Sequence, residues 1–156
     1  MRVAVGTNGQ RLSDPEFAAR ILPHLDELSL SLHGADSVVH DASTGRPGSF
    51  DQLMATRELA GRLAPRLPLA ANAVITRRNF DSAEAIVSLC GVAGIHRLLL
   101  SNVAPEGAAL APFERPAVPL ESWQGSAAGL VALADRSEVR VRLLGLPIPA
   151  LGHARV

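Results

Sequence analysis

The segment LSLSL at residues 28–32 decides the fold class of this chain. Its strict alternation of leucine and serine predicts a β-strand with one apolar face and one face of small polar side chains. Working outward, apolar residues at helical spacing lie before it at 18–25 and after it at 49–63. A strand placed between two helices is typical of an α/β fold built on a parallel sheet.

Further β-rich segments extend this pattern along the chain. The unbroken apolar run at 98–100 predicts a strand buried on both faces. Arg140 and Arg142 alternate with apolar neighbours, which predicts a half-exposed edge strand at the end of the sheet. In all we expect five strands, at residues 3–5, 28–32, 69–75, 98–100 and 139–144.

Four helices are expected between these strands, near residues 13–25, 49–63, 81–91 and 120–135. Ser13 and Glu16 have the spacing of a capping box. Asp81 and Glu84 are expected to cap the third helix. Residues 33–48 are rich in Gly, Ser and Asp and are expected to form a loop. The order of elements fits either an open doubly wound sheet or an arc of a barrel.

Length and composition narrow the class of protein. The 156 residues predict a single domain over residues 1–156. Fifteen basic and fifteen acidic residues balance, which argues against a nucleic-acid partner. The sequence has no signal-peptide core and no apolar stretch long enough for a bilayer, so we expect no membrane partner and a cytoplasmic location. The single cysteine excludes an internal disulfide and an all-cysteine metal site.

Polar residues at the C-terminal ends of the predicted strands form the candidate site. Open sheets and barrels both bind ligands at that edge. Small hydrogen-bonding groups at four strand ends suit a polar, largely neutral ligand. The candidate binding residues at these ends are Thr7, Asn8, Gly9, Ser31, His33, Ser101 and Asn102, with residues 76–79 beside them, and Asn72 adds a polar side chain within the third strand. No catalytic residue and no metal-ligand set is assigned.

Five segments in order resemble one enzyme superfamily. These are VGTNGQRLSD at 5–14, LDELSLSLHGAD at 25–36, HDASTGRPGSFDQ at 40–52, LAANAVITRRNFDSAEAI at 69–86 and LLLSNVAPEGAA at 98–109. They resemble the later barrel strands of radical S-adenosylmethionine (radical SAM) enzymes. In that family a Thr-Asn-Gly turn follows the third strand, the fourth reads like SLHG, and a Gly-Ser-Phe step opens the next helix.

The resemblance implies a partial (β/α) barrel of about five parallel strands with outer helices. It implies that S-adenosylmethionine (SAM) lies across the strand ends, where a [4Fe–4S] cluster cleaves it to a 5′-deoxyadenosyl radical. By position in the motifs, Ser31 and Asn72 would face the ribose or the methionine end of SAM. Ser101 and Asn102 would lie near the adenine.

The sequence also departs from the family. Its CxxxCxxC cluster motif is absent, and the only cysteine, Cys90, lies on the apolar face of a predicted helix. Pro149 stands where the family often has a later cysteine. The chain alone is therefore not expected to perform radical chemistry, and whether it is an enzyme stays open. The resemblance implies a cluster-bearing segment or partner chain, and unpaired strand edges favour a homodimer.

Three interpretations follow. The chain is part of a radical SAM enzyme completed elsewhere, a degenerate homologue that binds a ligand or partner without catalysis, or an unrelated small α/β enzyme. Individual residues also have structural alternatives. Thr7, Asn8 and Gly9 fit an ordinary turn, Ser31 fits close packing, and Asp41 fits a cap better than an acid–base pair with His40. A buried Asn72 must find hydrogen-bond partners, which favours a functional role.

Overall fold

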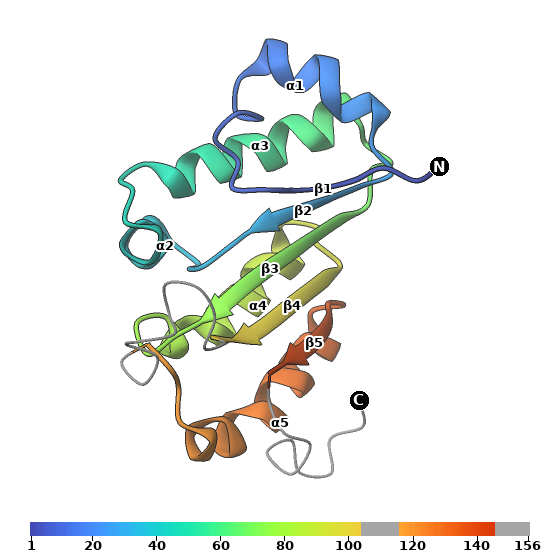
Figure 1. Ribbon diagram of the computed structural model, residues 1–156. Coiled ribbons are helices and arrows are strands. Elements are labelled where there is room, and N and C mark those ends of the chain that lie inside the picture. Colours follow the sequence, from blue (N-terminus) through green and yellow to red (C-terminus); the bar gives the residue numbers. More distant parts are fainter. Residues whose placement is uncertain (104–115, 146–156) are drawn as a thin grey trace.

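A computed structural model describes residues 1–103 and 116–145. Five strands form one sheet in which every neighbouring pair is parallel (Figure 1). The spatial order follows the chain order from β1 to β5. The strands are β1 (Ala4–Thr7), β2 (Glu27–Ser31), β3 (Leu69–Ile75), β4 (Arg97–Asn102) and β5 (Arg140–Leu144).

Helices cover one face of this sheet. The α-helices are α1 (Pro15–Ile21), α2 (Ser37–Thr44), α3 (Ser49–Leu63), α4 (Ala83–Val92) and α5 (Leu120–Arg136), and two short 3₁₀ turns are η1 (Leu22–His24) and η2 (Phe80–Ser82). A sheet in which each strand pairs with the next, joined by crossovers of one hand, keeps its helices on one side. This strand order is that of an arc of a (β/α) barrel. It excludes the other expected arrangement, a doubly wound sheet.

The core lies between the sheet and the helices. Leu28, Leu30 and Leu32 are fully buried on the helix-facing side, as the alternation of β2 predicted. Burying each leucine contributes about 1.5–3 kcal/mol. On α4 the buried face consists of Ala83, Ile86, Val87 and Cys90. Trp123 on α5 completes the core and meets the Phe80 ring edge-on at 5.2 Å between centroids.

The opposite side of the sheet, here called the open face, is the inner side of the arc. It carries Ser29, Ser31, Asn72 and Leu99, which are all only partly buried. The prediction that residues 98–100 are buried on both faces is therefore wrong. Leu98 and Leu100 are buried against the helices, whereas no described element covers Leu99 on the open face.

Two local predictions about the first half of the chain are also wrong. Residues 33–48 contain α2, whose N-cap Asp36 accepts a hydrogen bond from Val39 N at 2.9 Å and whose C-cap Gly45 has φ +69°. The cap of α1 is Asp14, which accepts from Phe17 N at 2.7 Å. Ser13 instead donates to the Gln10 carbonyl at 2.9 Å. One good cap suffices for a helix, and the adjacent carboxylate takes that role.

The third helix begins differently from the prediction as well. Asp81 lies in the 3₁₀ turn η2, and α4 has no side-chain cap. The ends of α3 and β3 match the predicted residues. Within the described ranges, no helix is both long and apolar enough to cross a membrane. Pro105, Gly107 and Pro149 lie outside the described residues.

Candidate functional site

The sheet register brings three of the candidate residues onto the open face. Ser31 is paired with Asn72 across β2 and β3, and Asn72 is paired in turn with Leu99 of β4. Ser101 lies two residues further along β4, paired with Val74. Because paired residues in a parallel sheet point to the same side, the side chains of Ser31, Asn72 and Ser101 share this face. Ser31 and Ser101 lie at the C-terminal ends of their strands, and Asn72 lies in the middle of β3.

Asn72 has an unusual environment for an amide. Its Oδ1 atom is buried and accepts no hydrogen bond. Asn72 lines a hollow of about 310 Å³ on the open face. A buried acceptor without a partner is costly, so this oxygen is suited to a donor from a bound ligand. Ser43 Oγ and Trp123 Nε1 are also buried without partners, but they lie on helices rather than on the open face.

The residues of the first predicted turn use their polar atoms within the turn itself. Thr7 Oγ1 accepts from Gly9 N at 3.0 Å, and Asn8 Oδ1 accepts from Gln10 N at 3.2 Å. Gly9 has φ +83°, and a Cβ there would lie 2.7 Å from Leu53 Cα. Thr7 is paired with a helix-facing leucine, so its side chain points away from the open face. The structure thus gives this turn a packing role.

Asn102 also lies apart from the Ser31–Asn72 pair. It is paired with Ile75, a fully buried residue of the helix-facing side. Its Oδ1 accepts from Val103 N at 3.1 Å. Of the two residues expected near an adenine, Ser101 therefore faces the open side and Asn102 the other.

His33 is fixed where the ends of β2 and β3 meet. Its Nδ1 accepts from Val74 N at 3.3 Å, and its backbone N–H donates to His40 Nδ1 at 3.1 Å. An Nδ1 that accepts a hydrogen bond leaves the proton on Nε2 in the neutral ring. Burial lowers the pKa of His33, which favours this neutral form. His33 lines a small cavity of about 110 Å³ on one side and a wider one of about 1050 Å³ on the other.

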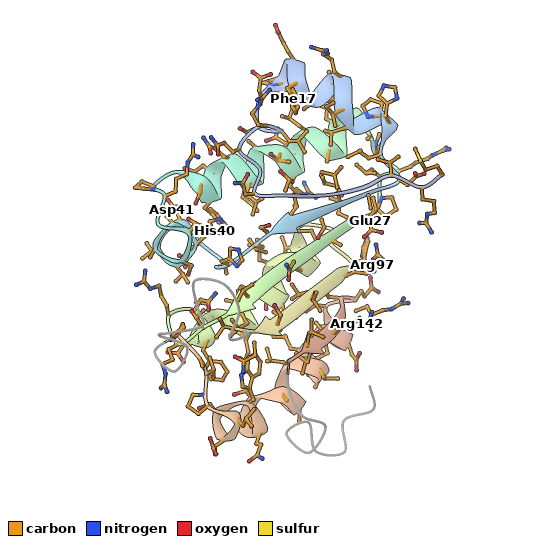
Figure 2. The ribbon with its side chains drawn as sticks, viewed as in Figure 1. Phe17, Glu27, His40, Asp41, Arg97 and Arg142 are labelled. Atoms are coloured by element: carbon orange, nitrogen blue, oxygen red, sulfur yellow. The ribbon has the colours of Figure 1, made fainter. Side chains whose placement is uncertain are left out.

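His40 and Asp41 lie together on α2 (Figure 2), and both form hydrogen bonds within the fold. The Asp41 carboxylate accepts from Gly48 N at 2.6 Å, from Phe50 N at 2.9 Å and from Ser49 Oγ at 2.9 Å. These hydrogen bonds lower the pKa of Asp41, and the one from Phe50 N has the largest effect. Burial and the neighbouring His33 lower the pKa of His40. Asp41 therefore caps α3 from the preceding helix, and the prediction of a cap is confirmed.

Asn79 is a residue whose role the sequence reasoning missed. Its Oδ1 accepts from Thr76 N at 2.7 Å and from Thr76 Oγ1 at 3.2 Å. Its Nδ2 donates to the carbonyls of His33 at 2.9 Å and Val74 at 3.0 Å. With 1% exposure, this amide joins the loops after β2 and β3 and holds His33 in place. A polar residue four positions after a strand does not by itself indicate that its side chain joins two loops.

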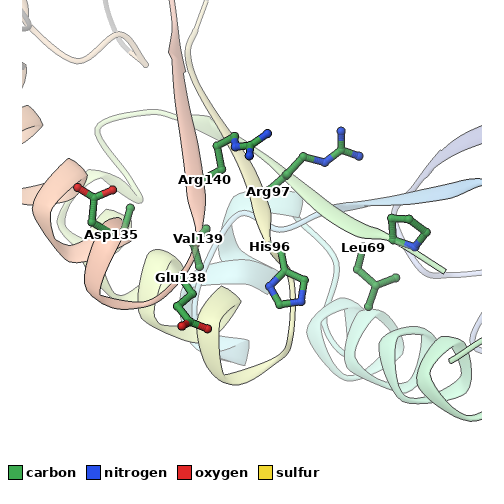
Figure 3. A pocket seen from close by; sticks show the side chains of 9 residues that line it. Leu69, His96, Arg97, Asp135, Glu138, Val139 and Arg140 are labelled. Atoms are coloured by element: carbon green, nitrogen blue, oxygen red, sulfur yellow. The ribbon is translucent and has the colours of Figure 1, made fainter. Parts of the chain in front are cut away.

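A separate hollow of about 530 Å³ lies at the other end of the strands (Figure 3). It is lined by His96, Arg97, Asp135, Glu138 and Arg140, among others. Ligands of parallel sheets bind beyond the carboxyl ends of the strands. The strand-end residues around Asn72 and His33 therefore form the candidate site.

The curated relatives of the chain share one name. No protein-family model matches the chain. A relative named AdoMet-dependent heme synthase, from Methanosarcina barkeri, is 30% identical over 108 residues, which are 69% of this chain and 30% of the relative. Another of that name, from Nitratidesulfovibrio vulgaris, is 32% identical over 104 residues, 64% of this chain and 28% of the relative. The chain is a radical SAM-like partial domain.

Solved structures show the same fold. Streptococcus suis SuiB, solved bound to its precursor peptide SuiA, matches the partial domain with a TM-score of 0.64 at 16% identity, over 92% of this chain and 31% of SuiB. A domain of the pyruvate-formate lyase-activating enzyme from Bacteroides vulgatus matches with a TM-score of 0.62 at 13% identity, over 92% of this chain and 81% of that domain. The partial domain spans about 30% of the curated relatives' length.

The family uses SAM and a [4Fe–4S] cluster, and the residues of the partial domain fit only the first of these. The unpartnered Asn72 oxygen next to Ser31 suits a ligand with ammonium and hydroxyl donors, as SAM has. Among the described residues, no three His, Cys, Asp or Glu side chains are grouped to hold a metal. Cys90 is buried in the helix-facing core, and burial raises the pKa of its thiol to about 12. This cysteine does not fit a cluster ligand.

Proposed function

We propose that the partial domain binds SAM across the C-terminal ends of β2, β3 and β4. The observation that carries this proposal is the buried Asn72 Oδ1, which lacks a donor and lies beside Ser31 on the open face. The name of the two relatives, AdoMet-dependent heme synthase, supports the choice of ligand, since AdoMet is SAM. In this proposal residues 1–156 act as a single domain.

Each residue has a distinct part in the proposed site. Asn72 accepts a hydrogen bond from an ammonium or ribose hydroxyl group of SAM, and Ser31 next to it donates or accepts as needed. His33 presents an Nε2–H donor, because its Nδ1 is occupied by Val74 N. Ser101 lies near the adenine. Thr7, Asn8, Gly9 and Asn102 shape the surrounding loops and the ends of their strands.

In the family, SAM supplies a 5′-deoxyadenosyl radical when a reduced cluster is beside it. The partial domain has no described residues for the cluster, so this chemistry requires a segment or partner chain that carries the cysteines. Within the described residues, β1 pairs only with β2, and its other edge has free backbone groups. We propose this edge as the place where such a segment, or a second copy of the chain, adds a strand.

A second candidate function is a homologue that binds a ligand or partner without catalysis. The burial of Cys90, the only cysteine, favours it, because the chain itself offers no reactive thiolate. The SuiB neighbour binds a precursor peptide, which makes a peptide one class of partner to consider. Both a part of a radical SAM enzyme and a non-catalytic homologue that retains the ligand would bind SAM. SAM binding is therefore the property to test first.

Isothermal titration calorimetry of the iron-free chain with SAM and with S-adenosylhomocysteine tests the proposal. We expect saturable binding that is at least tenfold weaker in Ser31→Leu and in Asn72→Leu. Ser88→Leu is the matched control, because Ser88 is exposed on α4 and only donates to the Glu84 carbonyl. Lack of binding to a chain that circular dichroism shows to be folded would contradict the proposal. Equal binding by all three variants would place any SAM site elsewhere.

A further inference from the structure

The open face carries three arginines that the SAM site does not use. Arg97 begins β4 and Arg140 begins β5, and the register pairs these two residues directly. Arg142 follows two positions later on β5, so it lies on the same face as Arg140. All three are exposed. Figure 3 shows the Arg97 and Arg140 side chains extending to the same side, and Figure 2 shows Arg142 beside Arg97 on that side of the sheet.

Among the described residues, only one of these arginines has an acidic partner. Arg97 forms a salt bridge with Glu27 of β2, reaching across β3 at the small residue Ala70. This is the only salt bridge within residues 1–103 and 116–145. Like charges directly opposite each other in a sheet are unfavourable. The Arg97–Arg140 pair, with Arg142 beside it, therefore leaves an excess of positive charge on one face.

The arginines surround a hollow of a size suited to a small ligand. The hollow of about 310 Å³ on the open face is lined by Glu27, Arg97, Arg140 and Arg142, with Asn72 at the side nearer the strand ends. Guanidinium groups bind carboxylate and phosphate oxygens with two parallel hydrogen bonds each. Two arginines on alternate positions of one strand and a third on the next strand can therefore hold one polyanion together.

SAM itself does not supply the missing negative charge. Its one carboxylate is offset by its ammonium group, and its sulfonium leaves a net positive charge. Adding SAM at the strand ends therefore increases the positive charge of the open face. Any neutralising ligand must be a separate, anionic molecule, whether or not the SAM site is correct.

We propose that the open face binds a small polyanion with phosphate or carboxylate groups through Arg97, Arg140 and Arg142. The site lies near the first residues of β4 and β5. Asn72 and His33 lie further toward the C-terminal side of the sheet. The shared chemistry is an oxyanion with two or more negative charges. Glu27 keeps Arg97 in position and limits how many anionic groups the face accepts.

Calorimetry of the full chain with pyrophosphate and with citrate, each at constant ionic strength in sodium chloride, tests the proposal. We expect at least one of the two to bind, and Arg140→Gln and Arg142→Gln each to weaken that binding about tenfold. Arg62→Gln on the exposed end of α3 is the matched control and should bind as wild type. A preference for pyrophosphate would indicate that the ligand carries phosphate groups. A preference for citrate would indicate a polycarboxylate.

Two results would overturn the proposal. One is the absence of binding by either anion to the folded chain. The other is equal weakening by Arg62→Gln and by the two sheet variants, which would indicate only general attraction to a basic protein. The Arg140→Gln variant should melt at or above the wild-type temperature, because the change removes like-charge repulsion. Titration of Ser31→Leu with the anion separates the two sites, because Ser31 does not line the hollow of about 310 Å³ and the anion affinity of this variant should not change.

Discussion

The loops after β2 and β3 differ from the open face of the sheet in whether polar side chains have hydrogen-bond or ion-pair partners. In the loops, Asn79 has all its hydrogen-bonding capacity satisfied by the chain, and Asp41 accepts three hydrogen bonds from the start of α3. On the open face, Asn72 Oδ1 has no donor, and only one of three arginines has an ion-pair partner in the described part of the chain.

The difference separates structural residues from candidate ligand-binding residues. Polar groups that the chain itself satisfies keep the loops in one conformation, and replacing them should lower stability. Polar groups that the chain leaves without partners contribute little to the fold, and replacing them should change only binding. Residue type does not distinguish the two groups, since both contain an asparagine: Asn72 lies in the middle of β3 and Asn79 in the loop after it.

The largest effect is expected at the first turn, which the sequence assigned to the binding site. Gly9→Ala should lower the free energy of unfolding by about 3 kcal/mol, because the residue has φ +83° and its Cβ would meet Leu53 Cα at 2.7 Å. Gly45→Ala is the control, with φ +69° and open space around it, and should cost about 1–2 kcal/mol. Urea unfolding measures both. Equal losses would show that packing against α3 is unimportant.

Next in size is the contrast between the two asparagines. Asn79→Ala should lower the free energy of unfolding by about 2 kcal/mol, since it leaves buried partners in the loops unsatisfied. Asn72→Ala should stay within about 0.5 kcal/mol of wild type, because its Oδ1 has no partner to lose. Chemical denaturation of the two variants in parallel tests this. A substantial loss in Asn72→Ala would mean that Asn72 is structural and would remove the basis of the proposed site.

A smaller, pH-dependent effect is expected from His33. Its pKa is lowered in the folded chain, so the unfolded chain binds more protons once the pH falls below the ordinary histidine value of about 6.5. The contribution to stability is complete above that pH and is lost as the pH falls toward the lowered pKa. Urea unfolding between pH 7.5 and pH 5 should show this decline, and it should be shallower in His33→Gln. His24→Gln, at an exposed site, should keep the wild-type slope. Identical slopes in His33→Gln and wild type would contradict this role.

The smallest effect concerns the turn that leads into β5. Glu138 has φ +55°, the only positive φ outside glycine in the described residues. Val139 N donates to the Ala134 carbonyl at 2.9 Å, which closes the end of α5 in the manner of a Schellman motif. Glu138→Gly should raise the melting temperature by a few degrees, equivalent to about 1 kcal/mol, because glycine adopts this conformation without strain. A lower melting temperature would indicate that the Glu138 side chain contributes a stabilising contact.

Much of the fold could be predicted from the sequence because the strands have clear patterns. The alternation of Leu28 to Leu32 and the apolar face of α4 each depend on nearby residues, and periodicity reports them directly. The helix α2 was missed because its eight residues are mostly polar and lie between glycines. The burial of residues 98–100 was overestimated because periodicity gives no information on how many layers cover a sheet.

The candidate site was predictable only in part. Ser31 and Ser101 were expected at strand ends and Asn72 within the third strand, and the register brings all three to one face. Which polar atoms remain free depends on contacts between distant residues, such as Asn79 with the His33 carbonyl. The arginines of β5 were interpreted only as an edge pattern and Arg97 of β4 was not singled out, because their pairing across the sheet follows from the register.

The most direct test of the account follows the side-chain amides of Asn72 and Asn79 by nuclear magnetic resonance during a SAM titration. Both residues lie on or directly after β3, but only Asn72 has an unpartnered oxygen on the open face. The account predicts that the Asn72 amide resonances move and saturate with the calorimetric dissociation constant, while those of Asn79 shift far less. Unchanged Asn72 resonances at saturating SAM would contradict it.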